Sequence, residues 1–171
     1  MPAQDKVVRF EQALLPHLDA AFNLARWLTR NQQDAEDVVQ EAYLRALTFF
    51  DSFHGEDGRG WLLTIVRNTC YTWLRKNRPA WLEEGFDEGR LEAESGAPDP
   101  EALRIANAGR ERVHQALSEL PAEYREVQVL REMEELSYKQ ISSIVGVPLG
   151  TVMSRLARAR KRLGQLLGSG E

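Results

Sequence analysis

Apolar residues recur at intervals of three and four along most of this chain, and no alternating pattern of useful strand length interrupts them. This periodicity predicts an all-α protein. In the N-terminal half it predicts three helical stretches: 5–29, 34–50 and 61–78. Pro16 is expected to break the first and Pro79 to end the third, since proline lacks an amide hydrogen. The stretch 51–60 contains three glycines and is predicted to be a loop.

The charges are strongly segregated, although the formal net charge is only -4 over 171 residues. Two windows, 58–82 and 136–170, contain no Asp or Glu. Between them, 83–101 holds eight acids and a single arginine, together with Gly, Pro and Ser. This pattern indicates two separate surfaces that face a polyanion, joined by a flexible acidic linker.

The C-terminal half is predicted to begin with a helix over 105–119. Its apolar stripe is expected to consist of Val113, Ala116, Leu117 and Leu120. Pro121 suits the first turn of the next helix, because its missing amide hydrogen is not needed there. The stripe of that helix is predicted to be Tyr124, Val127, Leu130 and Met133.

A helix-turn-helix is predicted next. Ser137 and Gln140 have the spacing of a capping box, and Leu136 can pack on Ile141 as a hydrophobic staple. Gly146 suits the left-handed position that ends the helix. Because only 147–150 separate this helix from the next, the two helices must pack at a large angle.

The last helix has two unlike faces. Its core face is predicted to hold Val152, Leu156, Ala159 and Leu163. Its opposite face holds Thr151, Ser154, Arg155, Arg158, Lys161 and Arg162. Arginine donors reach guanine edges and phosphates, and short hydroxyl side chains let a helix approach the groove. A solvated basic face is the alternative, but a capped helix and a tight turn in front of it favour DNA contact.

Several kinds of site are not expected. A single cysteine, Cys70, excludes an intrachain disulfide and a Cys-rich metal site, and three scattered histidines do not have ligand spacing, so no metal or cofactor is predicted. Cys70 is interpreted as an apolar filler, with a thiol sensor as the alternative. No glycine-rich phosphate loop or spaced nucleophile and base indicates an enzyme. The chain lacks a signal peptide and a membrane-length apolar run, which predicts a cytoplasmic protein without membrane insertion.

Several segments, in this order, resemble the extracytoplasmic-function (ECF) sigma factors of bacterial RNA polymerase, of the sigma-70 family. They are DAEDVVQEAYLRAL, GWLLTIVRNTCYTWLRKNRP, LSELPAEYREVQVL, LSYKQI and GTVMSRLARARKRL. The resemblance covers nearly the whole chain. It implies sigma domain 2 over 1–79, a linker over 80–104, and sigma domain 4 with the helix-turn-helix over 105–171.

The resemblance also implies a function. Proteins of this family are not enzymes; they bind core RNA polymerase at the beta-prime clamp helices and the beta flap, and direct it to promoter DNA. The residues that match the core-binding positions are Asp37, Gln40 and Glu41, although exposed acids in a first helical turn also serve as simple dipole partners. An anti-sigma factor is an expected partner. The alternative is a stand-alone helix-turn-helix regulator, which would leave the basic aromatic helix of the N-terminal half unexplained.

The DNA contacts implied by the resemblance fall in two groups. The minus-10 group is Ser52, Phe53, His54, Arg59, Arg67 and Asn68. The minus-35 group is the face of the last helix from Thr151 to Arg162 given above. Trp61 and Trp73 are interpreted as core residues rather than as platforms on which bases stack.

Overall fold

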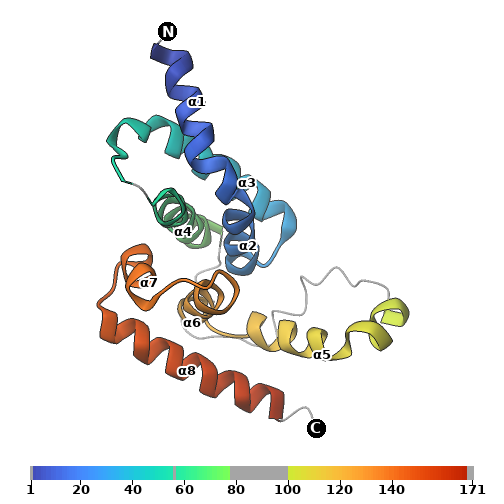
Figure 1. Ribbon diagram of the computed structural model, residues 1–171. Coiled ribbons are helices and arrows are strands. Elements are labelled where there is room, and N and C mark those ends of the chain that lie inside the picture. Colours follow the sequence, from blue (N-terminus) through green and yellow to red (C-terminus); the bar gives the residue numbers. More distant parts are fainter. Residues whose placement is uncertain (1, 56, 78–99, 169–171) are drawn as a thin grey trace.

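The computed structural model describes residues 2–55, 57–77 and 100–168, with side chains from 5 onward in the first range and from 109 onward in the last. Every regular element in these ranges is a helix, which confirms the all-α prediction (Figure 1). The N-terminal half contains α1 (Pro2–Leu14), the 3-10 turn η1 (Leu15–His17), α2 (Leu18–Thr29), α3 (Gln32–Thr48), the 3-10 turn η2 (Phe50–Ser52) and α4 (Gly58–Asn77). The C-terminal half contains α5 (Pro100–Ser118), α6 (Ala122–Gln128), the π-helical turn η5 (Val129–Met133), α7 (Tyr138–Val145) and α8 (Leu149–Gly168).

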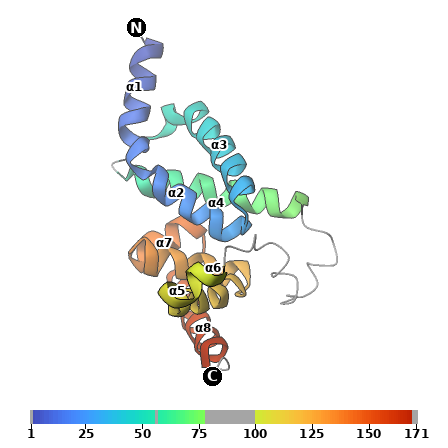
Figure 2. The same cartoon turned by 90° about the vertical axis from the view of Figure 1, so that its right-hand side faces the viewer.

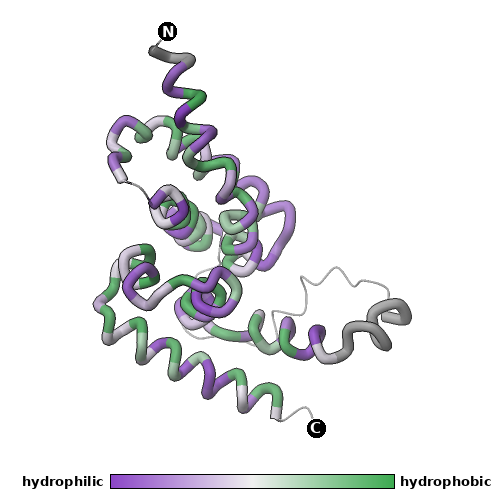
Figure 3. Tube along the Cα trace, in the orientation of Figure 1, coloured by the Kyte–Doolittle hydropathy of each residue, from purple (hydrophilic) through white to green (hydrophobic). Residues whose placement is uncertain are grey.

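Apolar and polar residues are interspersed along the described helices, as Figure 3 shows, which is typical of helices that bury one face. The predicted break at Pro16 is present, because α1 gives way to η1 at this proline. The start of α3 is fixed by Asn31, whose side-chain oxygen accepts a hydrogen bond from the Asp34 amide at 2.9 Å.

Helix α4 begins at Gly58, three residues earlier than predicted. The Asp57 carboxylate accepts a hydrogen bond from the Gly60 amide at 2.8 Å and so caps the helix. The last three residues of the predicted loop, 58–60, therefore form the first turn of α4. Gly58 also lies against α1, where an added Cβ would be 2.7 Å from the Ala13 carbonyl oxygen. Glycine is therefore needed for the close approach of these two helices.

The stripes predicted for the C-terminal half are correct in part. Val127 and Leu130 are fully buried, but Met133 is 43% exposed and Val113 on α5 is 49% exposed. The periodicity of α5 is helical there, yet the helix extends away from the rest of the molecule, so this stripe is not covered along its length (Figure 1). The helix also begins at Pro100, five residues earlier than predicted, consistent with the preference of proline for a first turn.

The helix-turn-helix forms as predicted. Ser137 Oγ accepts a hydrogen bond from the Gln140 amide at 3.0 Å, and Gln140 Oε1 accepts one from the Ser137 amide at 2.9 Å. Leu136 and Ile141 are buried, and Gly146 ends α7 with φ 74° in the left-handed region. The predicted core residues of α8 are confirmed by Val152, Leu156 and Ala159, which are buried, and Leu163, which is half-buried.

The two halves pack directly against each other. Helices α2 and α4 contact α6, η5 and α7, and the views of Figures 1 and 2 both place α1 to α4 beside the C-terminal half. Buried residues of both halves form one hydrophobic cluster, from Phe10 to Ala159. The sequence predicts two helical domains joined by a flexible linker, and the direct contact between them is a finding of the structure. The predicted linker, 80–104, lies outside the described residues up to 99, and its last five residues form the start of α5.

Candidate nucleic-acid interface

The exposed face of α8 carries most of the residues predicted for the minus-35 group. Ser154, Arg158 and Lys161 are exposed, and Thr151 is half-buried at the start of the helix. The turn before α8 is held by Ser142, whose hydroxyl donates to the Val147 carbonyl at 2.5 Å. This side of α8 therefore presents donors at a fixed angle to the body of the molecule.

Two arginines of α8 are less free than predicted. Arg155 is drawn toward α6, with Nη2 3.9 Å from Glu123 Oε2, and its side chain is 20% exposed. Arg162 is half-buried. An ion pair at 3.9 Å with a glutamate whose side chain is 54% exposed is weak, so it holds the partly buried Arg155 only loosely. Arg160 is exposed and pairs with Glu132 at 3.2 Å.

The loop predicted to read the minus-10 element contains an aromatic cluster. The ring centroid of Phe53 lies 5.8 Å from that of Phe50 and 5.0 Å from that of Trp61, and the centroids of Phe50 and Trp61 are 6.2 Å apart. Ser52 and His54 are exposed, and the Ser52 hydroxyl donates to the Phe49 carbonyl at 2.7 Å. Trp61 and Trp73 are each half-buried and pack against the core.

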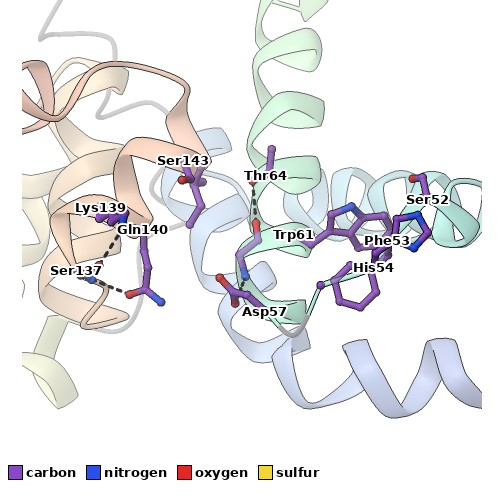
Figure 4. Close-up of a pocket in the computed structure, with 13 residues that line it drawn as sticks. Ser52, Phe53, His54, Asp57, Trp61, Thr64, Ser137, Lys139, Gln140 and Ser143 are labelled. Carbon is purple, nitrogen blue, oxygen red and sulfur yellow. Dashed lines mark hydrogen bonds between the residues drawn. The ribbon is translucent and has the colours of Figure 1, made fainter.

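A cleft of about 510 Å³ separates this loop from α7. Figure 4 shows Phe53, His54 and Trp61 on one side of it, and Lys139 and Gln140 on the other. Asp57, just before α4, and Thr64 of α4 also line it. The loop before α4 and the helix-turn-helix thus face each other across one cleft.

The remaining minus-10 candidates lie on or beside the contact between the halves. Arg59 donates to the Glu134 carbonyl of the other half at 3.4 Å, while Asn68 is exposed. Arg67 forms an ion pair with Glu126 of α6, with Nε 2.8 Å from Oε1. Arg67 therefore faces the second half of the chain and not solvent in this arrangement.

Glu126 is fully buried and accepts hydrogen bonds from two residues of α4. Arg67 donates through Nε and Nη2, and Tyr71 donates through its hydroxyl. Burial raises the pKa of Tyr71 above its usual range, and the negative charge of Glu126 raises it further, so the hydroxyl keeps its proton. Burial lowers the pKa of Arg67, but the hydrogen bond and charge of Glu126 outweigh this and raise it.

Other bonds between the halves surround this ion pair. Buried Arg125 donates from Nε to the Trp27 carbonyl at 2.6 Å, and Asn23 donates to Glu134 Oε2 at 2.9 Å. Sequence reasoning missed Glu126 and Arg125. A signal for Glu126 exists, because it lies four residues before Leu130, on the apolar side of the helix.

The candidate polymerase contacts lie on α3. Asp37, Gln40 and Glu41 are all exposed, and Glu41 forms an ion pair with Arg45 at 2.7 Å. Leu44, 59% exposed, follows them by one helical turn and was not predicted. A single exposed leucine is common on protein surfaces and does not by itself indicate a partner.

Within the described ranges, no helix is long and apolar enough to cross a bilayer. The same residues hold no group of three or more His, Cys, Asp and Glu side chains arranged for a metal ion. Cys70 is buried in the core, next to the contact between the halves.

Two family models match the two halves. The model of sigma-70 region 2 matches residues 14–80, and the model of sigma-70 region 4 matches residues 110–163. The chain is 35% identical to the ECF RNA polymerase sigma factor SigE of Mycolicibacterium smegmatis over 98% of its own length and 62% of that protein. It is 36% identical to the ECF RNA polymerase sigma-E factor of Escherichia coli K12, over 76% of this chain and 72% of that one.

A solved structure is also similar. The sigma factor RpoE of Bartonella quintana, determined in complex with the anti-sigma factor NepR, matches with a TM-score of 0.73 and 33% identity. The match covers 94% of this chain and 97% of that one. Regions 2 and 4, in this order in one chain whose described elements are all helices, define a protein of the sigma-70 family. The chain belongs to its ECF sigma factors.

Proposed function

We propose that this protein is a specialised sigma factor that binds core RNA polymerase and directs it to promoters for transcription initiation. The observation that carries this proposal is the presence, in one chain, of sigma regions 2 and 4, each with a cationic helix. The protein supplies recognition, and the bond-forming chemistry belongs to the polymerase. We place it in the cytoplasm, where core polymerase and DNA are.

The minus-35 element is assigned to α8. Ser154, Arg158 and Lys161 are exposed on the face away from the core, and Thr151 and Arg155 lie at its edge. Early turns of a recognition helix meet base edges, whereas later ones meet phosphates. We therefore assign base contacts to Thr151 through Arg158, and phosphate contacts to Lys161 and Arg162.

The minus-10 element is assigned to the loop before α4 and to α4 itself. The aromatic cluster around Phe53 and the exposed side chains of Ser52, His54 and Asn68 support this assignment. Single-stranded DNA binds where aromatic faces and cations lie together. Arg59 and Arg67 belong to this group once the two halves separate.

Core polymerase is assigned to α3, through Asp37, Gln40 and Glu41. Their exposure supports this, and Leu44 extends the same surface. An anti-sigma factor is a further proposed partner, supported by the similarity to a sigma factor determined with one. A stand-alone helix-turn-helix regulator is not favoured, because region 2 would then have no role.

Run-off transcription with core polymerase on genomic templates, followed by sequencing of the 5′ ends, tests this function. We expect transcripts that depend on the protein and that share upstream elements. The Arg158→Ala variant should lose most of this activity, whereas Arg110→Ala, an exposed arginine on α5, should retain it. Transcripts no different from those of core polymerase alone would contradict the proposal.

A further inference from the structure

We propose that Arg67 and Tyr71 form a binding site for a backbone phosphate of promoter DNA, and that Glu126 occupies this site as an internal mimic when the two halves are in contact. This inference rests on the proposed function, since it supposes that α4 binds DNA. It adds Tyr71 to the DNA-binding residues and assigns Glu126 a role as competitor. Domain contact and phosphate binding by α4 then exclude each other.

The geometry around Glu126 is that of a complete oxyanion site. Arg67 Nε lies 2.8 Å from Oε1, and Nη2 lies 3.2 Å from Oε2. Tyr71 donates its hydroxyl to the same Oε2. Three donors from one helix thus converge on a single carboxylate with no exposed surface.

Tyr71 also positions the arginine. The Arg67 guanidinium carbon lies 4.0 Å from the centroid of the Tyr71 ring, which holds the donor group over the aromatic face. Nη1 donates to Asn68 Oδ1 at 3.3 Å, which orients the group further. The donor array is therefore fixed largely by α4 itself and remains available when α6 moves away.

The same array suits a phosphodiester. An arginine fork binds the two oxygens of a carboxylate or two oxygens of a phosphate with parallel hydrogen bonds. A backbone phosphate has two non-bridging oxygens, as Glu126 has two carboxylate oxygens. Exchange of one for the other leaves every donor of the site satisfied.

The charge distribution explains why the competing acid comes from the other half. Helix α4 contains no Asp or Glu from Gly58 to Asn77, and Arg75 and Lys76 in its last turn are exposed. A helix of this kind is suited to a polyanion along its length. Glu126 supplies from α6 the negative charge that DNA would supply.

A purely structural ion pair is the competing explanation. Buried ion pairs add little net stability over an apolar contact of the same size, because both charges lose their hydration. A structural pair and a phosphate mimic nevertheless make different predictions. A structural pair functions with its charges in either order, whereas a phosphate site needs the arginine on α4.

The first experiment measures binding of the full-length protein to a fluorescein-labelled 20-nucleotide oligothymidylate. We expect Glu126→Gln to tighten binding about tenfold, because the competing charge is removed. Glu111→Gln, which removes an exposed acid of α5, is the matched control for net charge and should change binding less than twofold. Arg67→Gln or Tyr71→Phe, added to Glu126→Gln, should reverse most of the gain.

The salt dependence of the same measurement adds a second readout. Each phosphate contact on a single strand contributes about 0.7 to the slope of log K against log salt concentration. The slope for Glu126→Gln should exceed that of Glu126→Gln with Arg67→Gln by about this amount. Equal slopes, or a Glu126→Gln gain that persists without Arg67, would overturn the proposal.

The second experiment exchanges the charges, with Arg67→Glu and Glu126→Arg in one chain. This variant keeps an ion pair between the halves, and circular dichroism should show a folded protein. We expect it to lose promoter-dependent transcription by at least tenfold, since α4 then presents an acid to DNA. Wild-type-like transcription by the exchanged variant would show that the ion pair is purely structural and would overturn the proposal. If the wild-type chain itself directs no transcription, the proposed function fails, while the oligothymidylate measurement still decides whether Glu126 competes for the site.

Discussion

At the scale of single residues, Met153 is an exposed apolar side chain of α8, close to the exposed polar residues Ser154 and Arg158. It is 50% exposed, and Leu149, one turn earlier, is 47% exposed. Both lie near the start of α8, close in sequence to Ser154. Apolar side chains in the major groove contact the methyl group of thymine. Met153 is therefore expected to favour thymine in the minus-35 element.

This expectation is tested with minus-35 duplexes in which deoxyuridine replaces thymidine, which removes only the methyl group. One buried methyl group is worth about 0.8 kcal/mol, so the protein should bind the contacted position about fourfold more weakly. Met153→Ala should bind both duplexes equally, whereas Met133→Ala, an exposed methionine of η5, should keep the difference. Equal affinity of the unmodified protein for the two duplexes would refute a methyl contact.

Cys70 permits a second test at this scale. Burial raises the pKa of its thiol from 9.0 to about 12, and the charge of Glu126 adds to the shift. This shift of about three pKa units makes the thiolate fraction at pH 8 about a thousandfold lower than in the unfolded chain. We expect iodoacetamide to leave Cys70 unmodified in the native protein and to alkylate it in denaturant. Rapid native alkylation would instead support a thiol sensor.

The same shift has a defined sign for stability. The folded state keeps the Cys70 proton more tightly than the unfolded state, so unfolding releases a proton above pH 9. The stability that the protonated Cys70 thiol contributes is fully present below pH 9 and is lost as the pH rises toward 12. In denaturant titrations between pH 9 and 12, the free energy of unfolding of Cys70→Ala should therefore fall less with pH than that of the wild-type protein.

At the scale of helices, the contact between α1 and α4 depends on Gly58. A methyl group at this position would approach the Ala13 carbonyl oxygen to 2.7 Å, so the backbone must move. We expect Gly58→Ala to lower the free energy of unfolding by about 1–3 kcal/mol in urea titrations. Gly164→Ala in α8, where the Cβ meets nothing within 4 Å, should instead raise it by about 0.5–1 kcal/mol. The same change for both variants would show that helix propensity, not the contact, decides.

Helix ends and faces were largely predictable from the sequence, because their signals are local. Ser137, Gln140 and Gly146 mark the two ends of α7 within ten positions, and each behaves as its chemistry requires. The start of α4 was missed because Asp57 acts as a cap within a stretch rich in glycine. Val113 was misassigned because spacing alone does not reveal whether another element covers a face.

The candidate site was predicted less completely than the fold. The exposed face of α8 follows from its spacing, but the ion pair of Arg67 with Glu126 joins residues 59 positions apart. No periodicity encodes such a pair. The only local signal, a glutamate on the apolar side of α6, identifies the anomaly but not its partner.

At the scale of the whole molecule, the two halves are held together by buried polar groups as well as by a shared core. Arg125 is only 3% exposed and donates to carbonyl oxygens of both halves, those of Trp27 and Leu120. These carbonyl groups are shielded from water by the contact itself. The arginine is therefore expected to stabilise the contact more than a surface residue would.

We expect Arg125→Met to lower the free energy of unfolding by about 2–4 kcal/mol, because buried acceptors of a charged donor are left without it. The measurement is chemical denaturation of the full chain, followed by circular dichroism and by tryptophan fluorescence. Arg110→Met, on the exposed part of α5, serves as the control and should change stability by less than about 0.5 kcal/mol. An equally small change for Arg125→Met would mean that water replaces the lost donors.

Helix α8 lies on the far side of the second half from α1 to α4 (Figures 1 and 2), with Val152, Leu156 and Ala159 buried and Ser154 and Arg158 outward. Substitutions on this outer surface leave the packing between the halves intact. The sequence preference that we propose for α8 can therefore change by substitution while the contact between the halves stays the same.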